Sequence, residues 1–182
     1  MNPEMCASIQ DSICAFSLPH YNEIPDMGLY LEQASKYITE KVAPLGDFGL
    51  TGSMISNYVK KDLIANPVKK QYSREQIATL FFIAIAKSVL SMEDIRMLLD
   101  LQRASYPPQQ AYRYFRLEMK NVLDYVFGFK TTLDAVGSEN SDEKTLLRNT
   151  IIAIAHKVYL EQYLTVLHAQ LQQEQASGAA PL

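Results

Sequence analysis

The sequence predicts an all-α protein with at most one tiny β element, and two observations carry this prediction. Hydrophobic residues recur at helical spacing through most of the 182 residues, and no alternating strand pattern of useful length interrupts them. The exception is the short stretch from Val68 to Tyr72, which favours a small hairpin or an extended wing. Hydrophobic residues make up 48 % of the chain, which is enough for a core.

Three helices are predicted in the first part of the chain. Apolar residues spaced four apart indicate a short amphipathic helix near the N-terminus: Met5, Ile9 and Ile13. Apolar residues over 29–38 mark a second helix, which ends before Pro44. Thr51 is a capping residue type, so we expect a third helix from this residue to about Lys61.

Two serine caps predict the next two helices. Ser73 and Gln76 form the capping-box pattern Ser-x-x-Gln ahead of a strongly apolar helix. Ser91 and Asp94 give a similar signal for the helix that follows.

Two long helices are predicted in the C-terminal part. One follows the proline pair at 107–108, and the last and longest runs from about 142 to 173. The last helix carries two apolar stripes, so it has to be covered on more than one side. Two alternatives follow, namely the central strut of a monomer or an intersubunit helix of a two-fold homodimer.

The stretch from 60 to 74 gathers positive charge in a chain whose formal charge is −3. The cations are Lys60, Lys61, Lys69, Lys70 and Arg74. On a helix over 53–61, one face is polar and the other is apolar. The polar face suits phosphates and base edges, and Asn57 has the side chain that pairs with adenine.

The same stretch resembles the MerR-type winged helix–turn–helix over about residues 50–100. The residues that carry the resemblance are Tyr58, the segment Asp62-Leu63-Ile64-Ala65-Asn66-Pro67, Lys69-Lys70-Gln71-Tyr72 and Leu90-Ser91-Met92-Glu93-Asp94-Ile95. The turn glycine of that family is Asp62 here. More closely, the chain resembles the YkrK-like family of uncharacterised bacterial proteins, a domain of unknown function. "LYLEQ" (29–33), "LTGSMISNYVKKDLI" (50–64) and "KKQYSREQIATLFFIAIAKSVLSMEDI" (69–95) carry that similarity.

The MerR-like resemblance and the pattern of helices together predict four parts of the chain. These are an N-terminal extension with a short helix (1–24), a MerR-like winged helix–turn–helix (25–103), a helical dimerisation or sensing region (104–175) and a disordered tail (176–182). The YkrK-like similarity implies a bacterial source. The MerR-like pattern, together with the basic stretch and the polar helix face, predicts a transcriptional regulator that binds double-stranded DNA. The two apolar stripes of the last helix favour a homodimer, and a small-molecule effector is left open. The expected DNA-binding residues are Thr51, Ser53, Ser56, Asn57, Tyr58, Lys60, Lys61, Lys69, Lys70, Tyr72 and Arg74. The alternative is a helical protein–protein interaction module that does not bind DNA.

Other function classes lack their residue patterns. The sequence has no glycine-rich phosphate loop and no nucleophile motif, and its three histidines form no metal-ligand set, so we expect no enzyme, no cofactor and no metal. Cys6 and Cys14 match neither a zinc nor a redox spacing and are expected to be free thiols. The N-terminus lacks a basic signal-peptide region, and no apolar run approaches the ~20 residues of a membrane span. We therefore expect a cytoplasmic protein without membrane contact.

Overall fold

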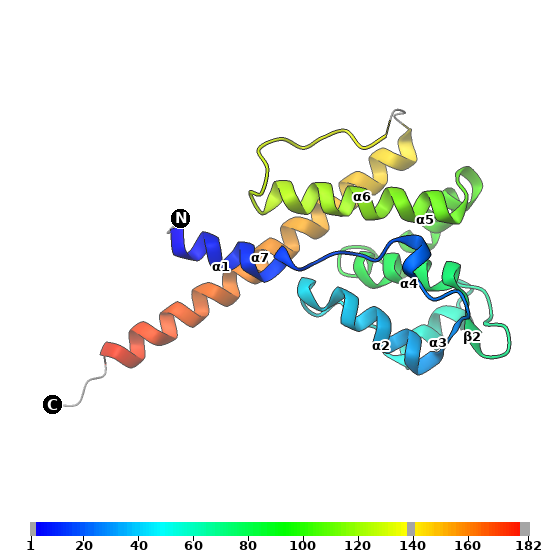
Figure 1. Cartoon of the computed structure of the whole chain (residues 1–182), viewed down its shortest axis with the longest axis horizontal. Helices are drawn as coiled ribbons and strands as arrows, with labels where there is room; N and C mark the ends of the chain where they lie inside the picture. Colours follow the sequence, from blue (N-terminus) through cyan, green and yellow to red (C-terminus); the bar gives the residue numbers. More distant parts are fainter. Residues whose placement is uncertain (1–2, 138–140, 179–182) are drawn as a thin grey trace.

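The computed structural model describes residues 3–137 and 141–178, and these residues are mostly helical (Figure 1). The α-helices are α1 (Pro3–Cys14), α2 (Leu31–Val42), α3 (Gly52–Lys60), α4 (Arg74–Ala86), α5 (Met92–Ser105), α6 (Pro108–Val126) and α7 (Asp142–Gly178). The shorter elements are the 3-10 helices η1 (Tyr21–Glu23) and η2 (Ala43–Leu45) and the strands β1 (Leu29–Tyr30) and β2 (Gln71–Tyr72). The prediction of a helical protein with one tiny β element is confirmed.

The β element differs from the expected local hairpin. Val68 and Gln71 do form a bridge across a tight turn, but the main partner of β2 is β1, about forty residues earlier in the chain. The pair is antiparallel, with Leu29 opposite Tyr72. The strand pair therefore joins the start of α2 to the start of α4.

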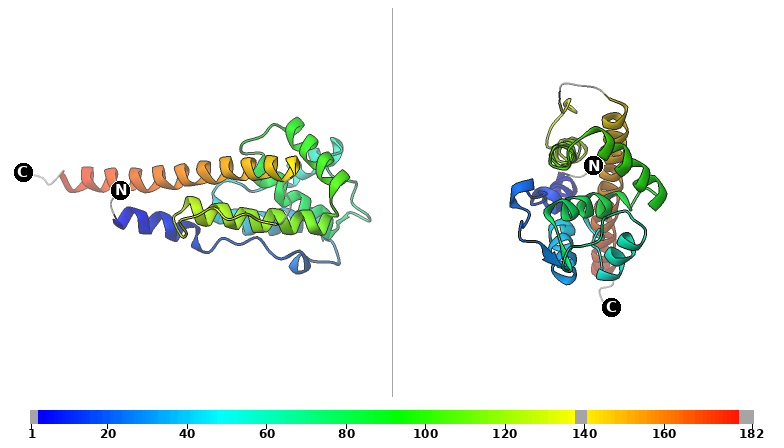
Figure 2. Two further views of the ribbon diagram at one scale, coloured as in Figure 1. Left: turned by 90° about the horizontal axis from the view of Figure 1, so that it is seen from above. Right: turned by 90° about the vertical axis from the view of Figure 1, so that its right-hand side faces the viewer.

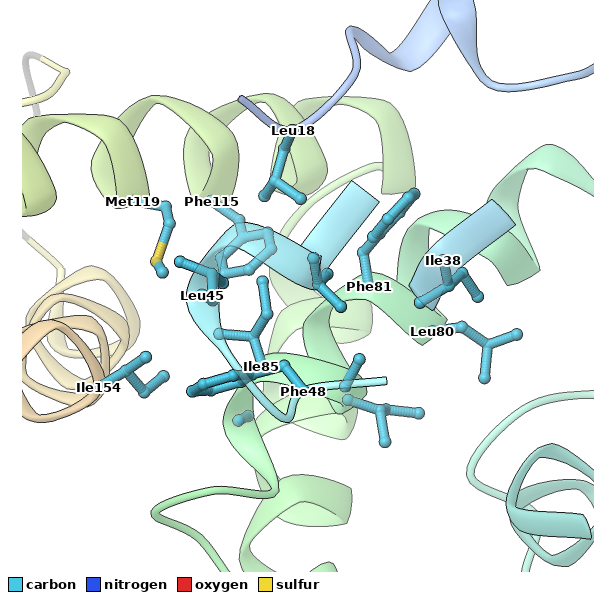
Figure 3. Close-up of a cluster of buried hydrophobic side chains, with 14 of the residues drawn as sticks. Leu18, Ile38, Leu45, Phe48, Leu80, Phe81, Ile85, Phe115, Met119 and Ile154 are labelled. Carbon is cyan, nitrogen blue, oxygen red and sulfur yellow. The ribbon is translucent and has the colours of Figure 1, made fainter. Parts of the chain in front are cut away.

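Helix α4 lies at the centre of the core. The helix carries buried apolar side chains of its own on all sides, so other elements have to cover it in every direction. Helices α2, α6 and α7 supply that cover. Figure 3 shows Phe81 and Ile85 of α4 among side chains of α2, α6 and α7. The Phe81 ring meets the Tyr37 ring of α2 edge-on, with 5.9 Å between the centroids.

A polar network fixes the connection between α6 and α7. The connection returns alongside α6, so α6 and α7 run in the same direction (Figures 1 and 2). The Glu118 carboxylate is fully buried on α6, and its Oε1 accepts from Arg148 Nε of α7 at 2.5 Å. The Asp134 carbonyl accepts from Arg148 Nη2 at 2.6 Å and from Asn121 Nδ2 at 2.9 Å. These bonds hold the loop between the two helices.

The C-terminal half of α7 projects from the body of the protein, and α1 lies along one side of it (Figures 1 and 2). Leu160, Leu164 and Leu171 on this half are 58 %, 48 % and 45 % exposed. The helix runs to Gly178, three residues into the segment from 176 that we expected to be disordered. The rest of that segment, 179–182, lies outside the described residues.

Candidate nucleic-acid interface

Helix α3 has one buried face and one exposed face. Ile55 and Tyr58 are buried, 0 % and 4 % exposed, and they anchor the helix to the core. Ser53, Asn57 and Lys60 are exposed, whereas Ser56 and Val59 are half-buried. The exposed face therefore carries a hydroxyl, an amide and an ammonium in consecutive turns.

The start of α3 is tied to α2 and α4 through the loop that precedes it. The Leu50 carbonyl accepts from Ser35 Oγ at 2.5 Å, and the Leu50 amide donates to Thr39 Oγ1 at 3.2 Å. Lys87 Nζ at the end of α4 donates to the Gly49 carbonyl at 2.9 Å. A Cβ atom on Gly49 would lie 2.9 Å from Thr39 Cγ2, so only glycine permits this approach to α2. These contacts hold the loop before α3 against α2 and the end of α4.

Thr51 caps α3 as the sequence predicts. Its Oγ1 accepts from the Met54 amide at 3.2 Å, which satisfies one of the unpaired donors of the first turn. The Thr51 side chain is exposed, so it lies at the edge of the exposed face of α3.

The end of α3 is a Schellman motif. The Leu63 amide donates to the Tyr58 carbonyl and the Asp62 amide to the Val59 carbonyl, both at 3.0 Å. Asp62 has a φ of +52°, in the left-handed region where helix ends usually place glycine. The turn therefore forms without the family glycine, at a conformational cost.

Side chains from α4 and α5 hold the segment after α3. Arg96 Nη2 donates to the Lys61 carbonyl, and Arg103 Nη2 donates to the Leu63 carbonyl at 2.7 Å. Gln76 Nε2 of α4 donates to the Ala65 carbonyl at 2.7 Å. Our sequence reasoning missed the two arginines. Their seven-residue spacing, which puts both on one face of α5, is the signal that points to a shared role.

The basic turn at 68–71 places two lysines at its tip. The Gln71 amide donates to the Val68 carbonyl at 2.9 Å, which closes the two-residue loop. Lys69 and Lys70 both have positive φ angles, +50° and +64°, and both side chains are exposed. Two consecutive positive φ angles characterise the type I′ hairpin turn. Figure 1 shows this turn and α3 at the same end of the molecule, far from the projecting end of α7.

Two expected contact residues are core residues instead. Tyr58 and Tyr72 are each 4 % exposed, so neither ring is on the surface that α3 and the turn present. Burial raises the pKa of both hydroxyls. We therefore remove both tyrosines from the expected set of DNA-contacting residues. The sequence alone did not distinguish the two roles, because a tyrosine fits both a core and a phosphate contact.

Arg74 is held by the N-terminal segment. Its Nε donates to the Ile24 carbonyl at 2.8 Å, its Nη1 lies 3.5 Å from Asp26 Oδ1, and its guanidinium lies over the Tyr21 ring at 5.7 Å. These contacts make it a structural residue that joins the segment before β1 to α4. The corrected set on the exposed surface is Thr51, Ser53, Asn57, Lys60, Lys61, Lys69 and Lys70, with Ser56 half-buried beside it.

Residues 19–115 match the family described as a domain of unknown function (DUF1836). The chain belongs to this family. Membership of an uncharacterised family agrees with what the sequence indicated, and the match itself does not address the winged helix–turn–helix. No curated protein and no solved structure matches the chain.

The matched range defines the family domain, residues 19–115. It contains every residue of the candidate interface and both arginines of α5, and it ends within α6. The projecting half of α7 lies outside it. Among the described residues, no helix is long and apolar enough to cross a membrane, and no group of three His, Cys, Asp or Glu side chains is placed to hold a metal ion.

Proposed function

We propose that this protein binds double-stranded DNA through α3 and the basic turn, as a transcriptional regulator of the winged helix–turn–helix kind. The observation that carries the proposal is the exposure of Asn57, Lys60 and Lys61 at the same end of the molecule as Lys69 and Lys70. In this arrangement α3 enters the major groove, while the turn contacts the neighbouring phosphates.

The order of elements supports the same proposal. A helix pair, α2 and α3, is followed by a tight basic turn, and the strand after the turn pairs with a strand before the helix pair. Because the strand pair ties the basic turn to the start of α2, the turn keeps a constant position beside α3. Phosphate contacts from both elements can then be made at once.

The conformation of the basic turn supports a role for its charge. Type I′ turns favour asparagine and glycine, and each non-glycine residue in the left-handed region costs about 1 kcal/mol. Lys69 and Lys70 both adopt this conformation despite its cost, and their ammonium groups lie at the exposed tip of the turn. Such local strain is characteristic of functional positions.

A homodimer is the second part of the proposal. Leu160, Leu164, Leu167 and Leu171 recur at the four-three-four spacing of a helix–helix seam. Three of these leucines are among the exposed large hydrophobic residues, whereas α1 covers another side of α7. A second copy packed on this seam supplies the missing cover and pairs two DNA-binding ends.

A protein-interaction module is the alternative, and a specific observation favours it. Val68 and Met27 lie next to the strand pair and are 75 % and 85 % exposed. Apolar side chains at this end suit a protein partner better than they suit phosphate groups.

The test of DNA binding is a fluorescence-anisotropy titration of a random duplex at several salt concentrations. Each phosphate that a lysine neutralises contributes about −0.9 to the log–log slope of affinity against salt. Changing Lys69 and Lys70 together to Ala should make the slope shallower by about two units per subunit. In the matched control, Lys120 of α6 and Lys157 of α7 are both changed to Ala. This variant should keep the wild-type slope of affinity against salt.

Asn57→Ala separates base reading from phosphate contact. It should keep the wild-type salt slope and reduce the preference among duplex sequences by about 1–3 kcal/mol. If wild type binds no duplex at about 50 mM salt, where phosphate contacts are strongest, the protein-interaction alternative replaces this proposal.

A further inference from the structure

A cavity of about 580 Å³ lies where α4, α5, α6 and the start of α7 meet. Its walls are mainly apolar and aromatic, with Phe82 from α4, Leu99 from α5, Phe115 from α6 and Leu147 from α7. The rings of Phe82 and Phe115 meet edge-on, with 5.5 Å between their centroids. The volume falls within the roughly 300–1,000 Å³ range of small-molecule sites.

Polar side chains in the walls form hydrogen bonds within the protein. Thr79 Oγ1 donates to the Glu75 carbonyl at 3.0 Å, and Gln102 Nε2 donates to the Tyr106 carbonyl at 3.2 Å. The Tyr106 hydroxyl shares a hydrogen bond with Ser141 Oγ at 3.2 Å. Because these groups already have protein partners, a molecule in the cavity is recognised mainly by apolar contact.

Charged side chains of the cavity are exposed to solvent or contact other protein groups. Glu75 and Arg113 are exposed. Glu143 Oε1 accepts from Ser105 Oγ at 3.4 Å, and Lys144 Nζ lies over two tyrosine rings, at 5.8 Å and 5.6 Å from their centroids. A charged ligand would have to give up its hydration between apolar walls, which is costly. The walls therefore favour a neutral molecule.

We propose that this cavity binds a small neutral molecule whose aromatic ring lies against Phe82, Leu99 and Phe115. A helix of a partner protein fits less well, because such a helix docks through apolar anchors spread over about two turns. Among the described residues that line the cavity, only Leu101 and Leu117 are exposed large hydrophobic residues, and they lie on different helices. The apolar surface is thus mostly inside the cavity, where a small molecule reaches it.

The cavity shares helix α5 with the supports of α3. Leu98 and Leu99 of α5 line the cavity, and Arg96 and Arg103 of the same helix donate to the carbonyls of Lys61 and Leu63. A bound molecule that restrains α5 therefore restrains the segment after α3 as well. The consequence for DNA affinity rests on the proposed function, but the binding and the restraint do not.

The test of binding is a fluorescence titration with the neutral probe N-phenyl-1-naphthylamine. Ala111→Phe on α6 and Leu98→Trp on α5 each fill part of the cavity, so each should weaken binding at least about tenfold. Ala153→Phe, on the exposed surface of α7, is the matched control and should bind the probe as wild type does. Circular dichroism at 222 nm identifies the folded variants. Wild-type affinity in both folded cavity variants would overturn the proposal.

The charge of the ligand is tested with 8-anilinonaphthalene-1-sulfonate, which has a similar ring system and a negative group. Ala111→Phe should change the affinity for this sulfonate by less than about twofold, because the sulfonate stays outside the apolar interior. A tenfold loss of sulfonate binding in this variant would show that the cavity accepts an anion and would overturn the assignment of a neutral ligand.

Methyl NMR tests where the neutral probe lies and whether another occupant takes its place. The probe should shift the methyl signals of Leu99 and Leu147 and leave those of Leu160 and Leu164 on the projecting half of α7 unchanged. Shifts confined to the projecting half would overturn the proposal. Shifts of the Leu99 and Leu147 signals on dilution of the protein alone would identify a second copy as the occupant and would overturn it too.

Hydrogen exchange tests the link to α3. Saturation with the neutral probe should slow amide exchange over 61–66 by about threefold or more in wild type. Arg103→Gln lacks the bond to the Leu63 carbonyl, so it should bind the probe but show a smaller slowing. Unchanged exchange in wild type would overturn the restraint. Failure of DNA binding in the anisotropy experiment leaves these probe results intact, so the two proposals fail separately.

Discussion

Asp62 stands at the position after α3 where the chain turns back with a positive φ. Glycine adopts this conformation without steric cost, whereas an L-residue pays about 1–2 kcal/mol, and a short polar side chain such as that of aspartate recovers only part of it. We expect Asp62→Gly to raise the free energy of unfolding by roughly 0.5–1 kcal/mol, measured by urea denaturation. Asp62→Ala is the control and should lower the free energy of unfolding, because alanine is disfavoured at a positive φ. An increase in the free energy of unfolding for Asp62→Ala would contradict the Schellman geometry.

Tyr112 donates its hydroxyl hydrogen bond to the Pro19 carbonyl at 3.0 Å, inside the core. Burial raises its pKa well above the usual value of 10.0. Above pH 10 the unfolded chain loses this proton and the folded protein keeps it. The free energy of unfolding therefore falls as pH rises, by up to about 1.4 kcal/mol per pH unit for one such group.

Tyr112→Phe should reduce this alkaline sensitivity. At pH 7 we expect it to cost about 1–2 kcal/mol, because the Pro19 carbonyl loses its donor. Above pH 10 the free energy of unfolding of the variant should fall less steeply with pH than that of wild type. The difference in slope should be up to about 1.4 kcal/mol per pH unit, measured by urea denaturation at pH 7 to 11. Tyr125→Phe, an exposed ring on the same helix, is the control for loss of a hydroxyl. Equal slopes in wild type and Tyr112→Phe would refute this account.

At the scale of elements, capping residues made the helix starts predictable. Ser73 and Ser91 each accept from the third residue of the helix that follows, and both helices begin where the sequence places them. Local hydrogen bonds of this kind depend only on residues three apart, so a single sequence contains the whole signal.

The pairing of β1 with β2 was not predictable in the same way. Each strand has two residues, too few for a period of two to appear, and the partner lies about forty residues away. The burial of Tyr58 and Tyr72 and the anchoring of Arg74 depend on the same long-range packing. The polar face of α3 was predictable because helical geometry alone separates its two faces.

The exposed leucines of α7 predict the assembly of the protein. Light scattering at micromolar concentration should give twice the chain mass for wild type. Leu160→Glu combined with Leu164→Glu should give the monomer mass, because two charges in an apolar seam are not tolerated. Ala169→Glu, on another side of the same helix, should remain dimeric. A monomeric wild type would remove the dimer from the proposed function.

At the scale of the whole molecule, the two ends of the structure differ in chemistry. The exposed polar residues of α3 and the lysines of the basic turn lie at one end, and the exposed leucines of α7 extend away from it (Figure 1). The cavity between α4, α5 and α6 lies beside the supports of α3. Under the proposed function, the first end contacts DNA and the exposed leucines contact a second copy.

The measurement that tests the central claim most directly is a ¹H–¹⁵N NMR titration of the protein with a random duplex at about 50 mM salt, where phosphate contacts are strongest. The account predicts that the amides of 51–61 and 68–71 shift or broaden first, while those of the projecting half of α7 do not. Perturbations confined to α6 and α7, or none at any duplex concentration, would contradict DNA binding by α3 and the basic turn.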